Sequence, residues 1–314
     1  MQYYFAPMEG LTDGIYRRLH QKYFPGIDRY YMPFISPTVH RCLTSKEARE
    51  LPPASHWQVT TVPQVLTKVA DDFLWIAKVC SDLGYEELNL NLGCPSGTVT
   101  AKGKGAGMLR DLSALDRFLE EIFAGTPLPI SVKTRLGFEN PEEFIAILDI
   151  YNRYPIKELT VHPRVRQVFY NGPVDMNMFD YACQNSKLPL CYNGNLCSTE
   201  DIESFSRQYP QVQAVMLGRG LIGDPGMLCP EGTTAAVLES FLNELFEEYC
   251  SAFGSARNAM FRMKENWRHL FCLFEENTKL QKQLRKAVDV AEYKTVTAQI
   301  LHNLPMHPRL QPDW

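Results

Sequence analysis

One stretch of the sequence, residues 89–107 (NLNLGCPSGTVTAKGKGAG), places a cysteine between a glycine and a proline and follows it with lysines and glycines. Leucines alternate with Asn89 and Asn91, which is the period of a β-strand, and the pattern stops at Gly93. We expect the segment after it neither to pack nor to stay rigid. Cys94 therefore lies where a buried strand meets a mobile loop, a common position for residues that do chemistry.

Other polar or reactive side chains follow predicted strands in the same way. Taken alone, Lys133 reads as a solvated loop lysine and His162 as a hydrogen-bonded core histidine. Their shared position after successive strands favours a functional interpretation, because the carboxyl ends of barrel strands form the active sites of such folds. In chain order these strand ends supply Pro7, Met8, Glu9, Gln64, Asn91, Cys94, Lys133, His162, Asn193, Gly194, Gly218 and Arg219.

The last two strand ends have the chemistry of a phosphate site. YNGN (192–195) and LGRG (217–220) place backbone amides and a guanidinium together, and glycine lets the backbone approach a ligand closely. They predict a phosphorylated cofactor. GKGAG (103–107) resembles part of a dinucleotide fingerprint, but it follows a strand-end turn and lacks the expected downstream acidic residue, so we interpret it as a flexible lid.

Short β-rich runs recur through the first two thirds of the chain and must position these residues. Helix-like segments at 69–84, 140–154 and 198–209 separate some of them, the last opening with a capping-box variant at Ser198 and Asp201. This alternation predicts a closed (β/α)₈ barrel, with an open doubly wound sheet as the alternative. The predicted strands lie near residues 3–6, 28–34, 57–64, 87–91, 129–133, 158–162, 189–193 and 213–217.

Composition excludes several classes of protein. The 314 residues are 45% hydrophobic and 22% charged, which is ordinary for a globular chain. No secretion signal or 18-residue apolar run is found, so we expect a soluble cytoplasmic protein without membrane contact. Nine cysteines without CxxC pairs indicate neither a disulfide framework nor a metal site. A net charge of −4 argues against a protein that simply coats nucleic acid.

At these residues the sequence resembles the dihydrouridine synthases, flavin enzymes that reduce selected uridines in transfer RNA. The resemblance covers residues 3 to about 228, and a weaker match, RMKENWRHLF, continues beyond. The chain departs from the usual family pattern at Asn89, Pro163 and Val165 and lacks a glycine shortly after Gln64, which bears on the choice of RNA and uridine. The matching pieces are APMEGLTD, NLNLGCPSGTVTAKGKGAGMLRD, SVKTRLG, TVHPRVRQVFYNG, YNGN and VMLGRGLIGDPGML.

The resemblance implies a (β/α)₈ TIM barrel that carries FMN (1–232), followed by a small all-helical RNA-binding domain (233–314). It implies that Cys94 is the proton donor and that NADPH supplies electrons. A thiol in a mostly apolar pocket stays protonated, and Lys133 would stabilise an anionic flavin. Asn91 would bond the pyrimidine edge. The residues expected to bind the cofactor are Pro7, Met8, Glu9, Gln64, Lys133, His162, Asn193, Gly194, Asn195, Gly218 and Arg219.

The implied partner is transfer RNA, bound by a single copy of the chain. Residues 255–286 carry a net charge of +5, from eight cationic and three acidic side chains. A run of charges is usually a solvated helix face, and the resemblance favours phosphate contact instead. We expect the interleaved Phe261, Trp267, Phe271 and Phe274 on the inner face of the helices. The predicted RNA contacts include Arg262, Lys264 and a basic rim of Lys102, Lys104, Arg164 and Arg166.

Three other functions stay open at this point. The first is a small-molecule FMN oxidoreductase similar to dihydroorotate dehydrogenases, which the basic aromatic tail argues against. The second is a dihydrouridine synthase that acts on another RNA. The third is a non-catalytic RNA-binding protein, against which the intact Cys94 and flavin positions argue.

Overall fold

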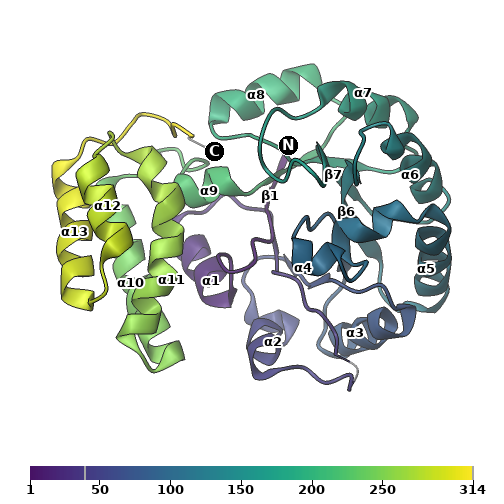
Figure 1. The fold of residues 1–314 in the computed structure, drawn as a ribbon, viewed down its shortest axis with the longest axis horizontal. Helices are drawn as coiled ribbons and strands as arrows, with labels where there is room; N and C mark the ends of the chain where they lie inside the picture. Colours follow the sequence, from purple (N-terminus) through teal and green to yellow (C-terminus); the bar gives the residue numbers. More distant parts are fainter. Residues whose placement is uncertain (39, 313–314) are drawn as a thin grey trace.

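The computed structural model describes residues 1–38 and 40–312 and shows a barrel joined to a bundle of helices (Figure 1). All the barrel strands are parallel, in the order β3-β2-β1-β9-β8-β7-β6-β5-β4. The predicted (β/α)₈ barrel with a C-terminal helical region is confirmed. The strands are β1 (Gln2–Phe5), β2 (Arg29–Tyr31), β3 (Thr61–Val62), β4 (Gln64–Val65), β5 (Leu88–Leu92), β6 (Ile130–Gly137), β7 (Leu159–Val165), β8 (Leu190–Tyr192) and β9 (Ala214–Leu217).

The third predicted strand is present as two short pieces. Pro63 separates β3 from β4, because proline has no N–H group to give to a neighbouring strand. β3 pairs with β2 on one side, and β4 pairs with β5 on the other. A further parallel bridge joins Ile35 to Val65. One broken strand therefore closes the barrel, which explains why nine strands occupy eight positions.

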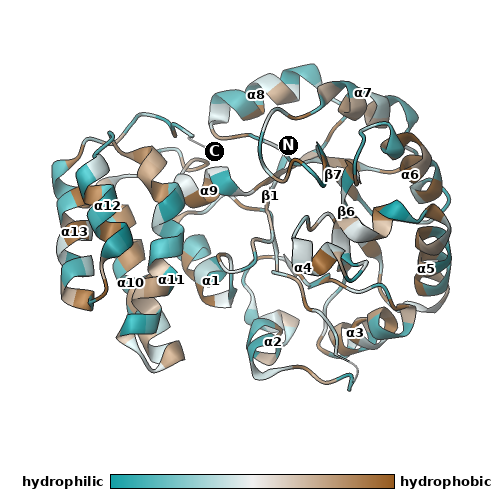
Figure 2. Cartoon of the chain, viewed as in Figure 1, coloured by the Kyte–Doolittle hydropathy of each residue, from teal (hydrophilic) through white to brown (hydrophobic). Residues whose placement is uncertain are grey.

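Helices alternate with the strands and cover the outside of the barrel (Figure 1). The three predicted helices are found as α3, α6 and α8, and the Ser198 side chain caps α8 by accepting from the Asp201 N–H. In Figure 2 the helices carry brown and teal residues side by side, as expected of helices with one buried face. The barrel helices are α1 (Gly14–Tyr23), α2 (Ser45–Glu50), α3 (Ala70–Asp82), α4 (Gly97–Thr100), α5 (Leu112–Gly125), α6 (Glu143–Tyr151), α7 (Met176–Asn185), α8 (Thr199–Gln208) and α9 (Arg219–Gly223), with 3₁₀ turns η1 (Ala54–His56) and η2 (Gly105–Arg110).

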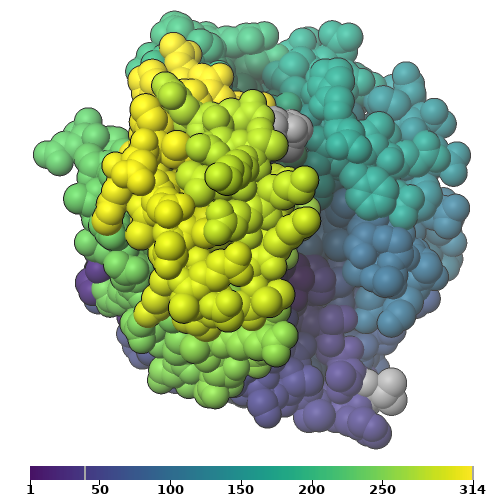
Figure 3. Space-filling view, turned by 60° about the vertical axis from the view of Figure 1, so that its left-hand side comes forward, coloured from purple at the N-terminus to yellow at the C-terminus, as the bar shows by residue number. Residues whose placement is uncertain are grey.

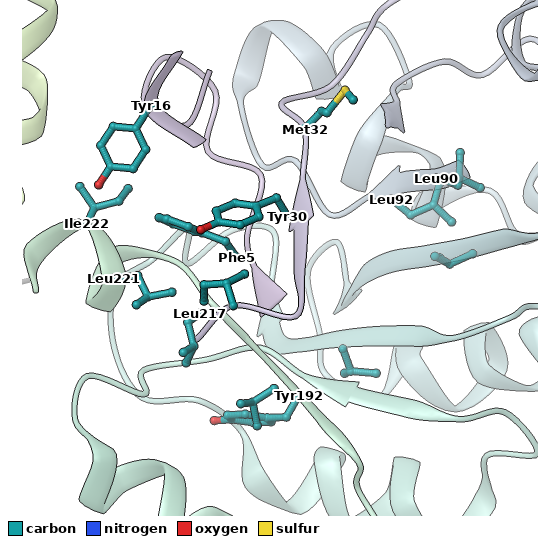
Figure 4. Close-up of a cluster of buried hydrophobic side chains, with 14 of the residues drawn as sticks. Phe5, Tyr16, Tyr30, Met32, Leu90, Leu92, Tyr192, Leu217, Leu221 and Ile222 are labelled. Carbon is teal, nitrogen blue, oxygen red and sulfur yellow. The ribbon is translucent and has the colours of Figure 1, made fainter. Parts of the chain in front are cut away.

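The C-terminal helices pack directly on the barrel and share its hydrophobic core. Phe241 of α10 contacts Tyr16, Tyr23 and Phe24, with ring centroids 5.3–5.9 Å apart. Figure 4 shows how Tyr16 of α1 and Ile222 of α9 continue the cluster that Phe5 begins in the barrel wall. The helical region comprises α10 (Ala235–Phe253), α11 (Ala256–Leu270), η3 (Phe271–Leu273), α12 (Thr278–Lys286) and α13 (Val290–Asn303).

A hollow separates part of the helical region from the barrel mouth (Figure 3). Residues from the first barrel loops line a cavity there, including Glu9, Phe34 and Ser36, and Arg262 of α11 closes its other side. The division at residue 232 stays a prediction. In the described part of the chain, no helix has the length and apolar character needed to cross a membrane.

Candidate functional site

A cavity that is open to solvent at its mouth lies at the carboxyl ends of β1 and β6–β9. Nine of the eleven residues predicted to bind a cofactor line this cavity, so residues spread over more than 200 positions meet at one place. They are Pro7, Met8, Lys133, His162, Asn193, Gly194, Asn195, Gly218 and Arg219.

The cavity is strongly cationic. Lys133, Arg164 and Arg219 line it, and none of the described lining residues is a carboxylate. Burial, with Arg135 adding repulsion, lowers the pKa of Lys133 to about 7. Burial and the neighbouring Arg164 lower the pKa of Arg219 to about 10. Burying several cations close together is unfavourable, because each loses water and repels the others. Such clusters are typical of anion sites, since a bound anion relieves this repulsion.

His162 is a neutral hydrogen-bonding group in this cavity. Burial and the charges of Arg135, Lys133, Arg164 and Arg219 hold its pKa well below the usual value. Its Nε2 lies 3.0 Å from Arg164 Nη1. Because a guanidinium can only donate, Nε2 must accept and the ring proton resides on Nδ1. Arg164 is thus buried against His162 and does not form part of an exposed basic rim, which corrects its expected position.

The loop after β8 requires a glycine and an unusual backbone conformation. A Cβ at Gly194 would lie 2.8 Å from Val174 and 3.0 Å from the Tyr192 hydroxyl. Asn195 adopts a left-handed conformation, with φ of 41°, and its Oδ1 accepts from Arg219 at 3.3 Å. The Asn193 Oδ1 accepts from Lys133 Nζ at 2.7 Å. This wall combines close backbone approach with donor groups, two features that suit a phosphate.

The segment after Cys94 differs from the expected mobile loop, because it packs. Residues 105–109 are buried in η2, and the Ala106 N–H donates to the Cys94 carbonyl at 3.1 Å. A Cβ at Gly107 would come within 2.7 Å of the Thr100 carbonyl. The prediction that this segment cannot pack is wrong: its glycines allow a tight turn, and they do not produce a loose lid.

Cys94 sits beside the cavity without lining it. Its strand β5 neighbours β6, and Asn91 is the register partner of Lys133. The thiol is half-buried, and desolvation raises its pKa despite the opposing charges of Arg135 and Lys133. The group is therefore protonated at neutral pH, as a proton donor must be.

Gln64 and Asn91 lie beneath Cys94 and bond to each other. The Asn91 Nδ2 donates to Gln64 Oε1 at 2.7 Å. The Asn91 Oδ1 accepts from the Gly93 and Cys94 N–H groups, at 3.1 and 2.9 Å. Gln64 is completely buried and Asn91 nearly so. The structure therefore uses Asn91 to hold the Cys94 turn, where we had expected it to present an amide to a pyrimidine.

Glu9 lies outside the cationic cavity, and the lysines of the expected basic rim differ from each other in their surroundings. Glu9 is exposed, lies outside the cationic cavity and pairs with Lys46 at 2.7 Å. Lys102 is exposed, whereas Lys104 Nζ donates to Ser36 Oγ at 3.0 Å. Arg166 donates to the Pro95 carbonyl at 3.0 Å and so ties the Cys94 turn to the end of β7.

The two helical residues predicted to bind RNA make contacts within the protein. Arg262 Nη2 lies 2.6 Å from Asp13 Oδ2, and Lys264 Nζ donates to the Ala287 carbonyl at 2.9 Å. Both contacts correct the expected phosphate-binding role. Phe261 is 43% exposed and does not lie on the inner face, whereas Trp267, Phe271 and Phe274 are buried as predicted.

Sequence reasoning missed Arg135 and Tyr170. Arg135 is fully buried and donates to the Gly93 and Val165 carbonyls, at 2.9 and 3.0 Å. Tyr170 lines the cavity, with its ring 5.3 Å from the Arg135 guanidinium. Strand alternation from Lys133 would have placed Arg135 on the same face. Within the described ranges, no cluster of three or more His, Cys, Asp or Glu could hold a metal ion.

Comparisons with known proteins agree with this geometry. The tRNA-dihydrouridine synthase B of Pasteurella multocida is 26% identical over 247 residues, covering 77% of this chain and 73% of that protein. The tRNA-dihydrouridine(16) synthase of Pseudomonas putida is 28% identical over 235 residues, covering 72% of each.

The solved old yellow enzyme homologue from Zymomonas mobilis shares the barrel fold, with a TM-score of 0.52 and 10% identity. The match covers 71% of this chain and 86% of that one. A family model described as "Dihydrouridine synthase (Dus)" matches residues 4–306. That match spans both the barrel and most of the helical region, and the chain belongs to the dihydrouridine synthase family.

Proposed function

We propose that this protein reduces the C5=C6 bond of specific uridines in transfer RNA to dihydrouridine, with FMN as cofactor and NADPH as electron donor. The observation that carries the proposal is the family match over residues 4–306. The names of the relatives in Pasteurella and Pseudomonas support transfer RNA as the substrate. A single cytoplasmic copy of the chain is part of the same proposal.

The cationic cavity fits FMN. Lysine and arginine side chains line it without a described carboxylate, and the buried Arg164 Nε has no hydrogen-bond partner. Gly194, Asn195 and Arg219 would hold the phosphate, while Lys133 would lie at the ring system and His162 would donate from Nδ1. Bound there, the flavin supplies the hydride that uracil reduction needs. Lys133 contributes positive charge that stabilises an anionic ring.

Cys94 supplies the proton in this proposal. Reduction of the pyrimidine double bond adds hydride to one carbon and a proton to the other, and the thiol Sγ is the donor. Burial keeps the thiol protonated, and the hydrogen bonds to Asn91 and Ala106 hold its backbone on both sides. A positioned acid of this kind contributes roughly 10²–10⁴-fold to a rate.

The uracil must leave its stacked position in folded RNA before it can enter the site. The hollow between barrel and helices (Figure 3) supports an approach of RNA across both parts. Exposed cations on α12 (Lys279, Lys282 and Lys286) replace Arg262 and Lys264 as the proposed phosphate contacts.

The test is nucleoside mass spectrometry of unmodified transfer RNA after incubation with the protein, FMN and NADPH. We expect dihydrouridine with the wild type and almost none with Cys94→Ala. No dihydrouridine with wild type, while NADPH is still consumed, would redirect the proposal to another RNA or a free pyrimidine.

A further inference from the structure

A continuous row of buried polar side chains runs inside the barrel from Glu87 to the backbone of Cys94. Glu87 Oε1 accepts from Ser131 Oγ at 2.6 Å, and Ser131 Oγ accepts from Asn89 Nδ2 at 2.9 Å. Asn89 Oδ1 accepts from Gln64 Nε2 at 2.7 Å. Gln64 then meets Asn91, which holds the Cys94 turn. Every side chain in this row is at most 7% exposed.

The register of the barrel aligns this row. Glu87 directly precedes β5, and Asn89 and Asn91 alternate along that strand with leucines that belong to the hydrophobic core. Asn89 is the register partner of both Gln64 on β4 and Ser131 on β6. Three neighbouring strands therefore place polar side chains at one level, within direct hydrogen-bonding distance.

The two ends of the row impose the same direction on every bond. At the upper end, the Gly93 and Cys94 N–H groups can only donate, so Asn91 must present its oxygen to them and its nitrogen to Gln64. This fixes the orientation of the Gln64 amide: its oxygen faces Asn91, and its nitrogen faces position 89. Position 89 must therefore offer an acceptor to Gln64.

At the lower end, Glu87 requires a donor. Its second oxygen pairs with Lys157 at 2.6 Å and Arg29 at 3.3 Å. The Ser131 hydroxyl donates to Glu87 at 2.6 Å in preference to the Leu88 carbonyl at 3.4 Å. Ser131 can therefore only accept a hydrogen bond from position 89. Residue 89 must accept on one side and donate on the other, which an amide does and a carboxylate does not.

We propose that Asn89 and Gln64 are positioning residues that hold Cys94 through Asn91, and that the amide at position 89 is required by its neighbours Ser131 and Glu87. The functional part of this inference rests on the proposed role of Cys94 as proton donor. The structural part concerns the Cys94 turn alone and can be measured separately.

The experiment compares Asn89→Asp with the double variant Glu87→Gln/Asn89→Asp, with Glu87→Gln as the matched control. The carboxylate of N89D competes with Glu87 for one hydroxyl proton. In the double variant, the new amide at position 87 can donate to Ser131, and Ser131 can donate to the new carboxylate at position 89. These two hydrogen bonds reverse, Gln64 still donates to position 89, and every link of the row is restored. Hydrogen exchange at the Gly93 and Cys94 amides reports the position of the turn directly, without substrate.

We expect exchange at these two amides to be at least about fivefold faster in N89D and to return to the E87Q rate in the double variant. Dihydrouridine formation should fall roughly tenfold or more in N89D and recover in the double variant. NADPH oxidation should stay the same in all of them. Exchange that is unchanged in N89D, or not restored by E87Q, would overturn the proposal.

Gln64→Met keeps the test decisive if N89D cannot be purified, because it removes the next link without adding charge. Faster exchange at Gly93 and Cys94 supports the row, and unchanged exchange contradicts it. If exchange behaves as expected but wild type makes no dihydrouridine on transfer RNA, the positioning inference stands and the proposed function fails.

Discussion

Arg262 of α11 binds Asp13, the residue that caps α1, with Nη2 and Oδ2 2.6 Å apart. The other oxygen of Asp13 accepts from the Tyr16 N–H and from the Tyr249 hydroxyl of α10, both at 3.0 Å. One carboxylate therefore joins the first barrel helix to two helices of the C-terminal bundle. Arg262 belongs to the joint between the two parts of the molecule.

Arg262→Ala should lower the free energy of unfolding by about 2–3 kcal/mol, because it leaves a largely buried carboxylate without its cation. Urea unfolding followed by circular dichroism measures the change. Arg268→Ala is the matched control on the same helix: Arg268 is mostly exposed and pairs with Glu265, so its loss should cost less than about 0.5 kcal/mol. Equal effects of the two variants would contradict the role of Arg262 as a joint.

Cys94→Ala should keep FMN binding and NADPH oxidation and lose nearly all uridine reduction. The thiol pKa is raised by burial, so the wild-type acid stays protonated through neutral pH and loses its proton only in alkaline solution. Titration of Cys94 should therefore cause no fall in single-turnover dihydrouridine formation below about pH 8. Normal turnover by the alanine variant would remove Cys94 from the mechanism.

The presence of most strands was predictable because it depends on local pattern, and alternating leucines located β5. The exact ends were not, because β6 runs on to Gly137 and β7 to Val165, so that His162 lies within its strand. His162 and Asn193 nevertheless line the same cavity. The way the barrel closes was harder to predict from the sequence. The strand breaks at Pro63 because its two halves pair with different neighbouring strands, β2 and β5.

Side-chain partners were the part that sequence could not supply. Arg262 and Lys264 look like any solvated cations on a helix, and only the docking of α11 gives them Asp13 and the Ala287 carbonyl as partners. The glycines at 103–107 suggested flexibility, since nothing local reveals that Thr100 and Cys94 pack against them. Long-range contacts decided each of these cases.

Lys133→Met should weaken FMN binding and remove part of its pH dependence. The Lys133 pKa is about 7 because the ammonium is desolvated, so wild-type affinity for an anionic ligand should fall as pH rises above about 7. Fluorescence titration of FMN between pH 6 and pH 9 measures this slope. A parallel slope in Lys133→Met would show that the lysine does not contribute.

The same substitution should stabilise the protein without FMN. The unfolded lysine has a pKa near 10.4, so burial of its charge is fully unfavourable below about pH 7 and the cost disappears towards pH 10.4. The gain in melting temperature of Lys133→Met should be largest below about pH 7 and should shrink towards pH 10.4. A gain that is independent of pH would point to packing rather than charge.

The α12 lysines should carry part of the RNA affinity. Lys279, Lys282 and Lys286 are exposed, and none has an ion-pair partner among residues 1–38 and 40–312, so changing them breaks no ion pair in that part of the chain. Replacing all three with glutamine should weaken transfer RNA binding and reduce the slope of log affinity against log salt by roughly 0.7–0.9 per lost phosphate contact. Lys78→Gln on α3 is the control, because Lys78 is equally exposed but pairs with Asp82 on the barrel. Filter binding at several salt concentrations gives both slopes, and a triple variant with the wild-type slope would exclude α12 from the RNA interface.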